Sequence, residues 1–341
     1  MEQFSIINIA TRIPDEAAAY KMLEELRWGD SNEGQTCPHC DAPGVHYFLN
    51  PENGTSRKTR TGSISQRRVW KCRSCRKQFS VLTGTIFHGT KIPVRTWLFV
   101  IFEMCSSKNG VSAREIERKY SLTPKSAWFL LHRIREAMKR EPLVGMLSGI
   151  VVADETFIGG SDRNRHQSVK NPRRGERIIP GQRANGGPFA DKTAVLSLID
   201  TATGEVRSQV VNDVTGATLR KAIAAQVDMA NTTLYTDEAK SYKTFANELA
   251  GHETVNHSKG QYVRYTAAAT ITSNRAEGFF SQLKRSLDGT HHHVSSKHLG
   301  RYLAEFDFRY STCKITDTAR MRILMGQVEG RRLSYRPLTG H

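Results

Sequence analysis

The stretch GIVVADETFIGG, residues 149–160, carries acidic side chains near the end of an apolar run. The run predicts a buried β-strand, and side chains that alternate along a strand place Val152 and Asp154 on one face and Glu155 on the other. Only one of the two adjacent acids can therefore belong to a given site. The fold depends on the strands and helices that come after this strand in the chain.

Strand and helix patterns alternate after residue 160. In order, they are a strand hairpin (192–211), a helix (217–229), a short strand (232–235) that leads directly to Asp237, a helix (240–249), a short strand (252–258) and a final helix. The order is β-β-β-α-β-α-β-α. One acid ends the first strand and another follows the fourth.

This order and these acid positions are what a ribonuclease H-like domain requires. Strands one and four lie side by side in such a domain, so acids at their matching ends meet, and a helix supplies a third acid. The candidate is Glu277 in TSNRAEGFFSQLKR, residues 272–285. This stretch also fits a capping box, with Asn274 as the N-cap and Glu277 at N3. The two interpretations are compatible, because a fixed first turn would also aim Glu277.

Two CxxC pairs, CPHC and CRSC, lie in the N-terminal part of the chain. Each pair can supply two thiolates from one tight turn, and four thiolates can surround Zn²⁺ tetrahedrally. Redox pairs or disulfides are weaker interpretations, because the amino terminus carries no secretory signal. We predict a structural zinc ribbon whose ligands are Cys37, Cys40, Cys72 and Cys75.

The charge balance favours a polyanionic partner. The chain has 50 Lys and Arg against 33 Asp and Glu, a formal charge of +17. Many basic residues and no acid lie between Ser56 and Gln78, around the second CxxC pair, which favours a surface that contacts phosphates. DNA is the partner that we expect.

A helical region separates the predicted ribbon from the strand region. GVSAREIERKYS and TPKSAWFLLHRIREAMKR are amphipathic, and Thr123 with Pro124 marks the start of the second helix. Two helices joined by a short turn, with basic residues on the second, fit a helix-turn-helix DNA-binding region. No apolar run is long enough to cross a membrane and no signal peptide is visible, so we expect a cytoplasmic protein.

Several segments together resemble one family. They are RSCRKQFSVLTGTIFHGTKIP, ADETFIGG, YTDEAKSY, NHSKGQYV and SNRAEGFFSQLKR with the GTHHHVSSKHLGRYLAEFDFRY that comes after it. They resemble the zinc-ribbon DDE transposases of bacterial insertion sequences, the ISXO-two-like group. The resemblance covers roughly residues 20–312.

The resemblance implies that Asp154, Asp237 and Glu277 form an acidic triad that holds two Mg²⁺ or Mn²⁺ ions. Asp154 would bridge the ions, and Asp237 and Glu277 would each complete one site. Carboxylate oxygens are the hard ligands that these ions prefer, and two such ions support in-line phosphoryl displacement. The reaction would cleave DNA at the element's ends and then transfer the freed strand to target DNA.

Two further residues and one loop are implicated by the same resemblance and by charge. Lys284, two helical turns after Glu277, would contact DNA near the scissile phosphate, and Asn274 would be either a cap or a second site residue. The basic loop Arg163–Arg183 would be either a clamp on DNA or a disordered insert.

We expect a multidomain α+β chain. Its parts would be an N-terminal helix and zinc ribbon (1–90), a helix-turn-helix region (91–142), an α/β ribonuclease H-like catalytic domain with a mixed five-stranded sheet (149–312) and a basic C-terminal tail (313–341). The expected function is that of a DNA transposase that acts as a homo-oligomer, since two ends must come together. The alternatives are a non-catalytic DNA-binding regulator and a ribonuclease H-like nuclease.

Overall fold

A computed structural model describes residues 4–49, 66–139, 145–159, 192–255, 263–265, 270–335 and Leu338. The basic loop at residues 163–183 and the basic side chains at positions 57, 58 and 60 lie outside these residues. The chain forms two compact units. One contains residues 1–138 with 313–341, and the other contains residues 139–312.

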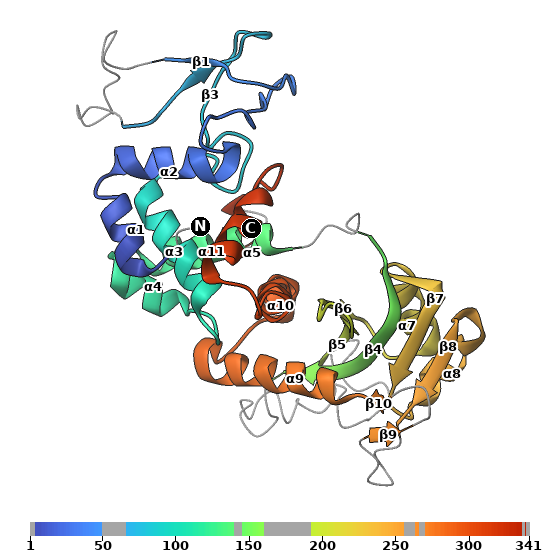
Figure 1. Ribbon diagram of the computed structural model, residues 1–341. Helices are drawn as coiled ribbons and strands as arrows, with labels where there is room; N and C mark the ends of the chain where they lie inside the picture. The colour runs from blue at the N-terminus through green and yellow to red at the C-terminus, as the bar shows by residue number, and fades with distance from the viewer. Residues whose placement is uncertain are drawn as a thin grey trace, which may run out of the picture. The chain divides into compact units, whose positions relative to one another are not determined.

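The first unit begins with two helices and a small antiparallel sheet (Figure 1). The helices are α1 (Ile6–Arg12) and α2 (Glu16–Trp28), and the strands, in the order β1-β2-β3, are β1 (Tyr47–Phe48), β2 (Trp70–Lys71) and β3 (Gln78–Phe79). The sheet packs on α2 through aromatic side chains, since Trp28 makes edge contacts with Trp70 and Phe79. Glu24 of α2 accepts a hydrogen bond from Trp70 Nε1 at 2.8 Å.

Four more helices of this unit lie in the described part of the chain. They are α3 (Val94–Ser106), α4 (Ala113–Tyr120), α5 (Pro124–Met138) and α11 (Asp317–Gly326). Thr123 Oγ1 accepts from the Ser126 backbone N–H at 3.2 Å, which is the expected cap at the start of α5. The expected recognition helix is nevertheless mostly enclosed. All residues from 130 to 135 are buried, and Pro124 and Lys125 in its first turn are exposed.

The C-terminal residues belong to the first unit rather than to a separate tail. The α11 helix packs against α3 and α2, and Thr318 Oγ1 accepts from the Phe4 backbone N–H at 2.6 Å. Buried Met321, Leu324 and Met325 explain the packing, because they give this basic segment an apolar face. Tyr335 then lies against Phe129 of α5, with ring centroids 5.4 Å apart.

The second unit is built on a mixed five-stranded sheet in the order β6-β5-β4-β7-β8. The strands are β4 (Leu147–Ile158), β5 (Thr193–Asp200), β6 (Val206–Val211), β7 (Val227–Thr236) and β8 (Gly251–Thr254). β5 is antiparallel to both of its neighbours, β4 and β6, whereas β4, β7 and β8 run parallel to one another. The predicted adjacency of strands one and four is confirmed by the pairing of β4 with β7.

Helices cover both faces of this sheet (Figure 1). On one face Val152 and Tyr235 join a core with α9 (Asn274–Ser286) and α10 (Ser296–Ser311). On the other face Val151, Ala153 and Leu234 pack with α7 (Gly216–Ala224) and α8 (Lys240–Lys243). Asp154 shares the strand parity of Val152, so its side chain belongs to the face that α9 covers.

Three local features differ from the sequence prediction. The helix expected over 240–249 is one turn, α8, followed by a 3-10 turn, η3 (Ala246–Glu248). The fourth strand begins at Val227 because this residue pairs with Leu147 of β4, so the tertiary pairing ends α7 early. An additional hairpin, β9 (Val263–Tyr265) and β10 (Thr270–Thr272), precedes α9, and a π-helical turn, η5 (Leu287–His291), comes after it.

Candidate metal centres

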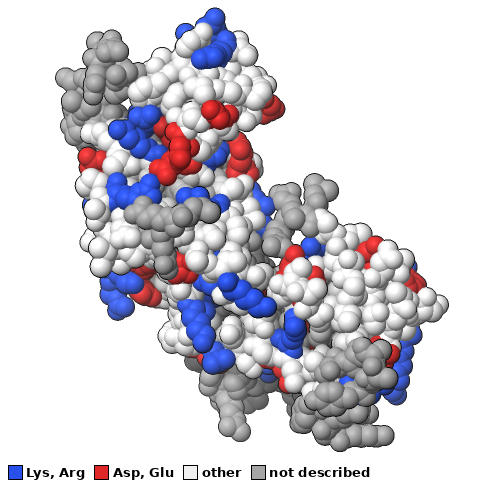
Figure 2. Space-filling model, in the orientation of Figure 1, with Lys and Arg blue, Asp and Glu red and all other residues white. Residues whose placement is uncertain are grey.

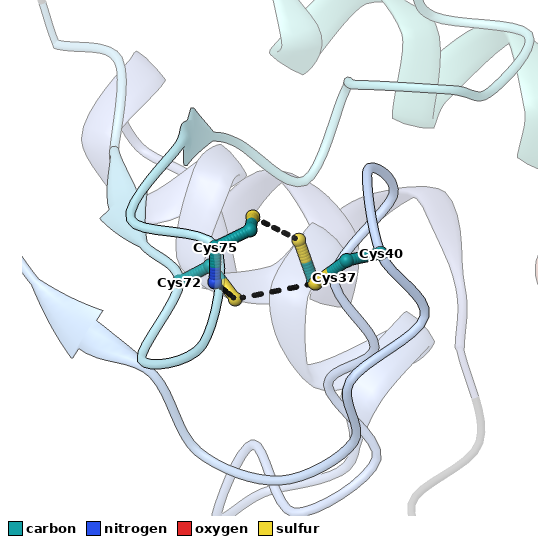
Figure 3. A group of neighbouring side chains, drawn as sticks. All are labelled: Cys37, Cys40, Cys72 and Cys75. Atoms are coloured by element: carbon teal, nitrogen blue, oxygen red, sulfur yellow. Dashed lines mark hydrogen bonds between the residues drawn. The ribbon is translucent and has the colours of Figure 1, made fainter.

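The four predicted cysteines come together between the two turns that carry them (Figure 3). The sulfur atoms of Cys37 and Cys75 lie 3.7 Å apart, as do those of Cys40 and Cys72. All four sulfurs lie within 4.8 Å of one another. In the part of the chain that the structure describes, this is the one group of three or more Cys, His, Asp or Glu side chains that meets this distance.

The cluster fits a tetrahedral Zn²⁺ site. A tetrahedron of sulfurs at about 2.3 Å from Zn²⁺ has edges of about 3.8 Å, close to the observed separations. Burial opposes ionisation of Cys72, but hydrogen bonds from the Cys75 and Ser74 backbone N–H groups and from the Cys37 and Cys40 thiols lower its pKa to about 6, whereas burial raises the pKa of Cys37 to about 12. The thiolate is the form that binds zinc. These cysteines therefore form a structural zinc ribbon.

The candidate acid Asp154 lies within β4, just beyond the point where its pairing with β7 ends, and Asp237 lies directly after β7. Val152 of β4 is paired with Tyr235 of β7. Asp154 stands two residues beyond Val152, and Asp237 stands two residues beyond Tyr235. Both acids therefore follow the last pair of the parallel register at the same offset, and both lie near enough to Glu155 for their charges to raise its pKa.

Backbone N–H groups orient both carboxylates. Asp154 Oδ1 accepts from the Glu155 N–H at 2.8 Å, and Asp237 Oδ1 accepts from the Ala239 N–H at 2.9 Å. Both side chains are half-buried. Each carboxylate is therefore oriented by the chain that comes directly after it.

Glu277 lies in the first turn of α9, on the covered face of the sheet. The α9 helix packs against β4 and β5, and Ala276 and Phe279 on either side of Glu277 are buried in the core that includes Val152. The three carboxylates of Asp154, Asp237 and Glu277 do not meet the 4.8 Å distance that the cysteines meet. The fold thus brings the acids to one region without closing a compact cluster.

The predicted capping box at Asn274 is wrong. The helix begins at Asn274 itself, and Ser273 occupies the cap position without a side-chain capping hydrogen bond. The Asn274 backbone N–H instead donates to Thr272 Oγ1 at 3.1 Å, because β10 leads into the helix without the extended residue that a cap requires. Asn274 and Lys284 are both exposed on α9.

A hydrogen-bonded pair of fully buried Tyr242 and half-buried Glu155 was not predicted from the sequence. Tyr242 Oη donates to Glu155 Oε1 at 2.6 Å. Burial, followed by the charges of Asp154 and Asp237, raises the pKa of Glu155 to about 7, against the opposing effect of the Tyr242 hydrogen bond. The only available sequence signal was Tyr242, the last residue of YTDEAKSY, and a tyrosine at such a position is typical of an ordinary core residue.

Basic side chains are distributed over the surface. Figure 2 shows Lys and Arg in several separate groups on the face that it draws. The exposed basic residues of the zinc ribbon are Arg67, Arg73, Arg76 and Lys77. Arg73 and Arg76 both lie over the ring of Tyr47, at 5.3 and 5.9 Å from its centroid. No helix in the described residues is long and apolar enough to cross a membrane.

Comparisons with known proteins cover both units. Residues 146–311 match the family described as ISXO2-like transposase domain, and residues 14–78 match the transposase zinc-ribbon domain. The chain is similar to an uncharacterized protein in transposable element ISH50 of Halobacterium salinarum, with 25% identity over 305 residues, 89% of this chain and 93% of that protein.

A solved structure with a similar chain is the cryo-EM structure of the simian T-cell lymphotropic virus intasome in complex with PP2A regulatory subunit B56 gamma. The TM-score is 0.27 and the sequence identity is 14%. The match covers 62% of this chain and 65% of that chain.

Proposed function

Because the chain belongs to the ISXO2-like transposases, we propose that it cleaves the ends of its element and joins them to target DNA. The observation that supports this proposal is the parallel register of β4 and β7, in which Val152 pairs with Tyr235 and Asp154 and Asp237 each stand two residues further along the chain. Glu277, on the helix that packs over the same face, is the third acid of the proposed site.

These carboxylates suit divalent ions of the Mg²⁺ class, which prefer hard oxygen ligands. Asp154, Asp237 and Glu277 would hold two such ions, which when bound would activate the attacking oxygen and stabilise the leaving one. The chain's own part is to aim the carboxylates. The backbone hydrogen bonds to Asp154 and Asp237 fix their orientation before the ions bind. Exposed Lys284 on α9 would contact the DNA backbone.

The first unit would bind the element's ends. The zinc ribbon presents exposed arginine and lysine side chains, which suit the phosphate backbone of DNA. In the helix-turn-helix, only the first turn of α5, near Pro124 and Lys125, is available to contact DNA, since most of the rest of that helix is buried. Cleavage and joining of two ends require two active sites, so we expect a homo-oligomer.

The test uses the full chain and a duplex that carries one terminal repeat, taken from the inverted repeats that flank the gene. Asp154→Asn should abolish Mg²⁺-dependent strand cleavage and leave binding of the duplex unchanged in a gel-shift assay. Asp228→Asn is the matched control, because Asp228 lies at the other end of β7. Cleavage that survives Asp154→Asn would exclude the proposed site. A wild-type chain that binds the ends and never cleaves them would favour the regulator.

A further inference from the structure

A partly buried hydrogen bond joins the two segments that carry Asp154 and Asp237. It is the 2.6 Å bond from Tyr242 Oη to Glu155 Oε1, and the Tyr242 side chain is fully buried. Glu155 comes directly after Asp154 on β4, and Tyr242 lies on α8, the next helix after Asp237. The bond therefore crosses from the strand of one acid to the helix after the other.

The bonded segments also hold the carboxylates. The Glu155 backbone N–H donates to Asp154 Oδ1 at 2.8 Å. The Ala239 backbone N–H, directly before α8, donates to Asp237 Oδ1 at 2.9 Å. A shift of Glu155 or of α8 would therefore move the carboxylate that it orients.

The α8 turn is itself fixed against α7. Ser241 Oγ donates to the Val214 backbone carbonyl at 2.8 Å. A Cβ at Gly216 would clash with Thr244 Oγ1 and lie 2.8 Å from the Ser241 carbonyl oxygen, so only glycine permits this approach. Tyr242 thus projects from a rigid support.

Packing alone does not require this polar pair. Val151 and Ala153, the preceding β4 residues whose side chains share this core, are apolar. A carboxyl group in that core loses its hydration, and an apolar side chain would pack there without that cost. The pair stands where the chain segments that come directly after the two candidate metal ligands meet.

We propose, resting on the proposed function, that Glu155 and Tyr242 are a positioning pair that sets the separation of Asp154 and Asp237. Through this separation the pair determines how tightly the acidic site binds divalent metal ions. The carboxylate of Glu155 points to the opposite face of the sheet from Asp154 and acts through the backbone.

The experiment measures Mn²⁺ binding to the full chain by electron paramagnetic resonance, with the rate of end cleavage against Mg²⁺ concentration as a second readout. Tyr242→Phe removes the donor and should weaken Mn²⁺ binding about tenfold or more, with cleavage restored at high Mg²⁺. Glu155→Gln keeps an acceptor for Tyr242 and should change binding by less than about threefold. Phe245→Leu is the control, because it perturbs the same core and leaves the bond intact.

Unfolding followed by circular dichroism would show which variants have the same free energy of unfolding. The pair has no positioning role if Tyr242→Phe binds Mn²⁺ like the wild type, or if an equally destabilised Phe245→Leu weakens binding as much. Glu155→Leu removes the acceptor and should act like Tyr242→Phe, which keeps the test decisive if Tyr242→Phe does not fold. If Asp154→Asn binds Mn²⁺ like the wild type, the proposed function fails, not only the pair.

Discussion

Val152 on β4 and Tyr235 on β7 are partners in a parallel register, and their side chains share one hydrophobic core with α9. This relationship fixes where the acids beyond them stand. Asp154 and Asp237 each stand two residues beyond this pair, Asp154 within β4 and Asp237 directly after β7. The pairing of Val152 with Tyr235 therefore sets the positions of the two acids that come after them.

Substitutions of Glu277 and Asn274 should have different effects on cleavage and on the free energy of unfolding. Glu277→Gln should abolish cleavage, because a neutral amide is a poor replacement for a carboxylate ligand. Asn274→Ala should change the free energy of unfolding by less than about 0.5 kcal/mol, because Asn274 is exposed and does not cap α9. Cleavage assays and urea unfolding followed by circular dichroism measure the two effects.

A capping role for Asn274 would instead cost about 1 kcal/mol on substitution by alanine. That loss, without a loss of cleavage, would contradict the helix start at Asn274. A loss of cleavage by Asn274→Ala at unchanged stability would make Asn274 a site residue beside Glu277.

The order of the sheet could be predicted because each strand has a local signal. Alternating or continuous apolar residues mark the strands, as before Asp154 and Asp237, although β4 continues beyond Asp154 to Ile158. The same signals could not reveal where α7 gives way to β7, since Val227 becomes a strand residue only by pairing with Leu147. Local propensity does not contain that pairing.

The parts that escaped prediction depend on contacts between distant segments. The hydrogen bond between Tyr242 and Glu155 joins residues that are far apart in sequence, and neither has a motif of its own. The α11 helix was not predicted, because basic residues surround its apolar side chains and one of these side chains, Ile323, is exposed. The cysteines were predictable because ligand spacing within each turn is local.

Loss of zinc should affect the first unit alone. Cys40→Ser should remove about one zinc ion per chain, measured by plasma mass spectrometry, and should abolish binding of the element's ends. All four tryptophans lie in the first unit, at positions 28, 70, 97 and 128, so their fluorescence reports on that unit. The spectrum should change, because Trp70 lies two residues before Cys72.

Cys313→Ser is the matched control, since Cys313 is exposed and outside the cluster. It should retain the zinc, the fluorescence and the DNA binding of the wild type. If Cys40→Ser also retained full zinc content, the four-cysteine site would be refuted.

Acidification should destabilise the second unit through His252. Burial lowers the pKa of His252; nearby Glu253 opposes this shift and Lys243 adds to it. The folded state therefore favours neutral imidazole, whereas the unfolded chain takes up a proton near pH 6.5. The contribution of His252 to stability is complete above that pH and is lost as the pH falls through its lower folded-state pKa.

His252→Gln should consequently reduce the decline in the free energy of unfolding between about pH 7.5 and pH 5.5. Glutamine can still bond Thr236 Oγ1, which lies 2.9 Å from His252 Nε2 in the wild type. Circular dichroism is the suitable measurement, because the second unit has no tryptophan. An identical pH dependence in variant and wild type would contradict the linkage.

Truncation after Gly326 should destabilise the first unit, since the residues beyond it are part of the fold. The Gly330 backbone N–H donates to the Gly84 carbonyl at 2.9 Å, and Val328 and Leu338 are buried. Burial of each apolar side chain contributes roughly 1.5–3 kcal/mol, so the loss should reach at least about 3 kcal/mol. Tryptophan fluorescence during urea unfolding measures this loss of stability.

The exposed control Arg332→Ala should stay within about 0.5 kcal/mol of the wild type. A truncated chain with wild-type stability would restore the interpretation of these residues as a separate basic tail.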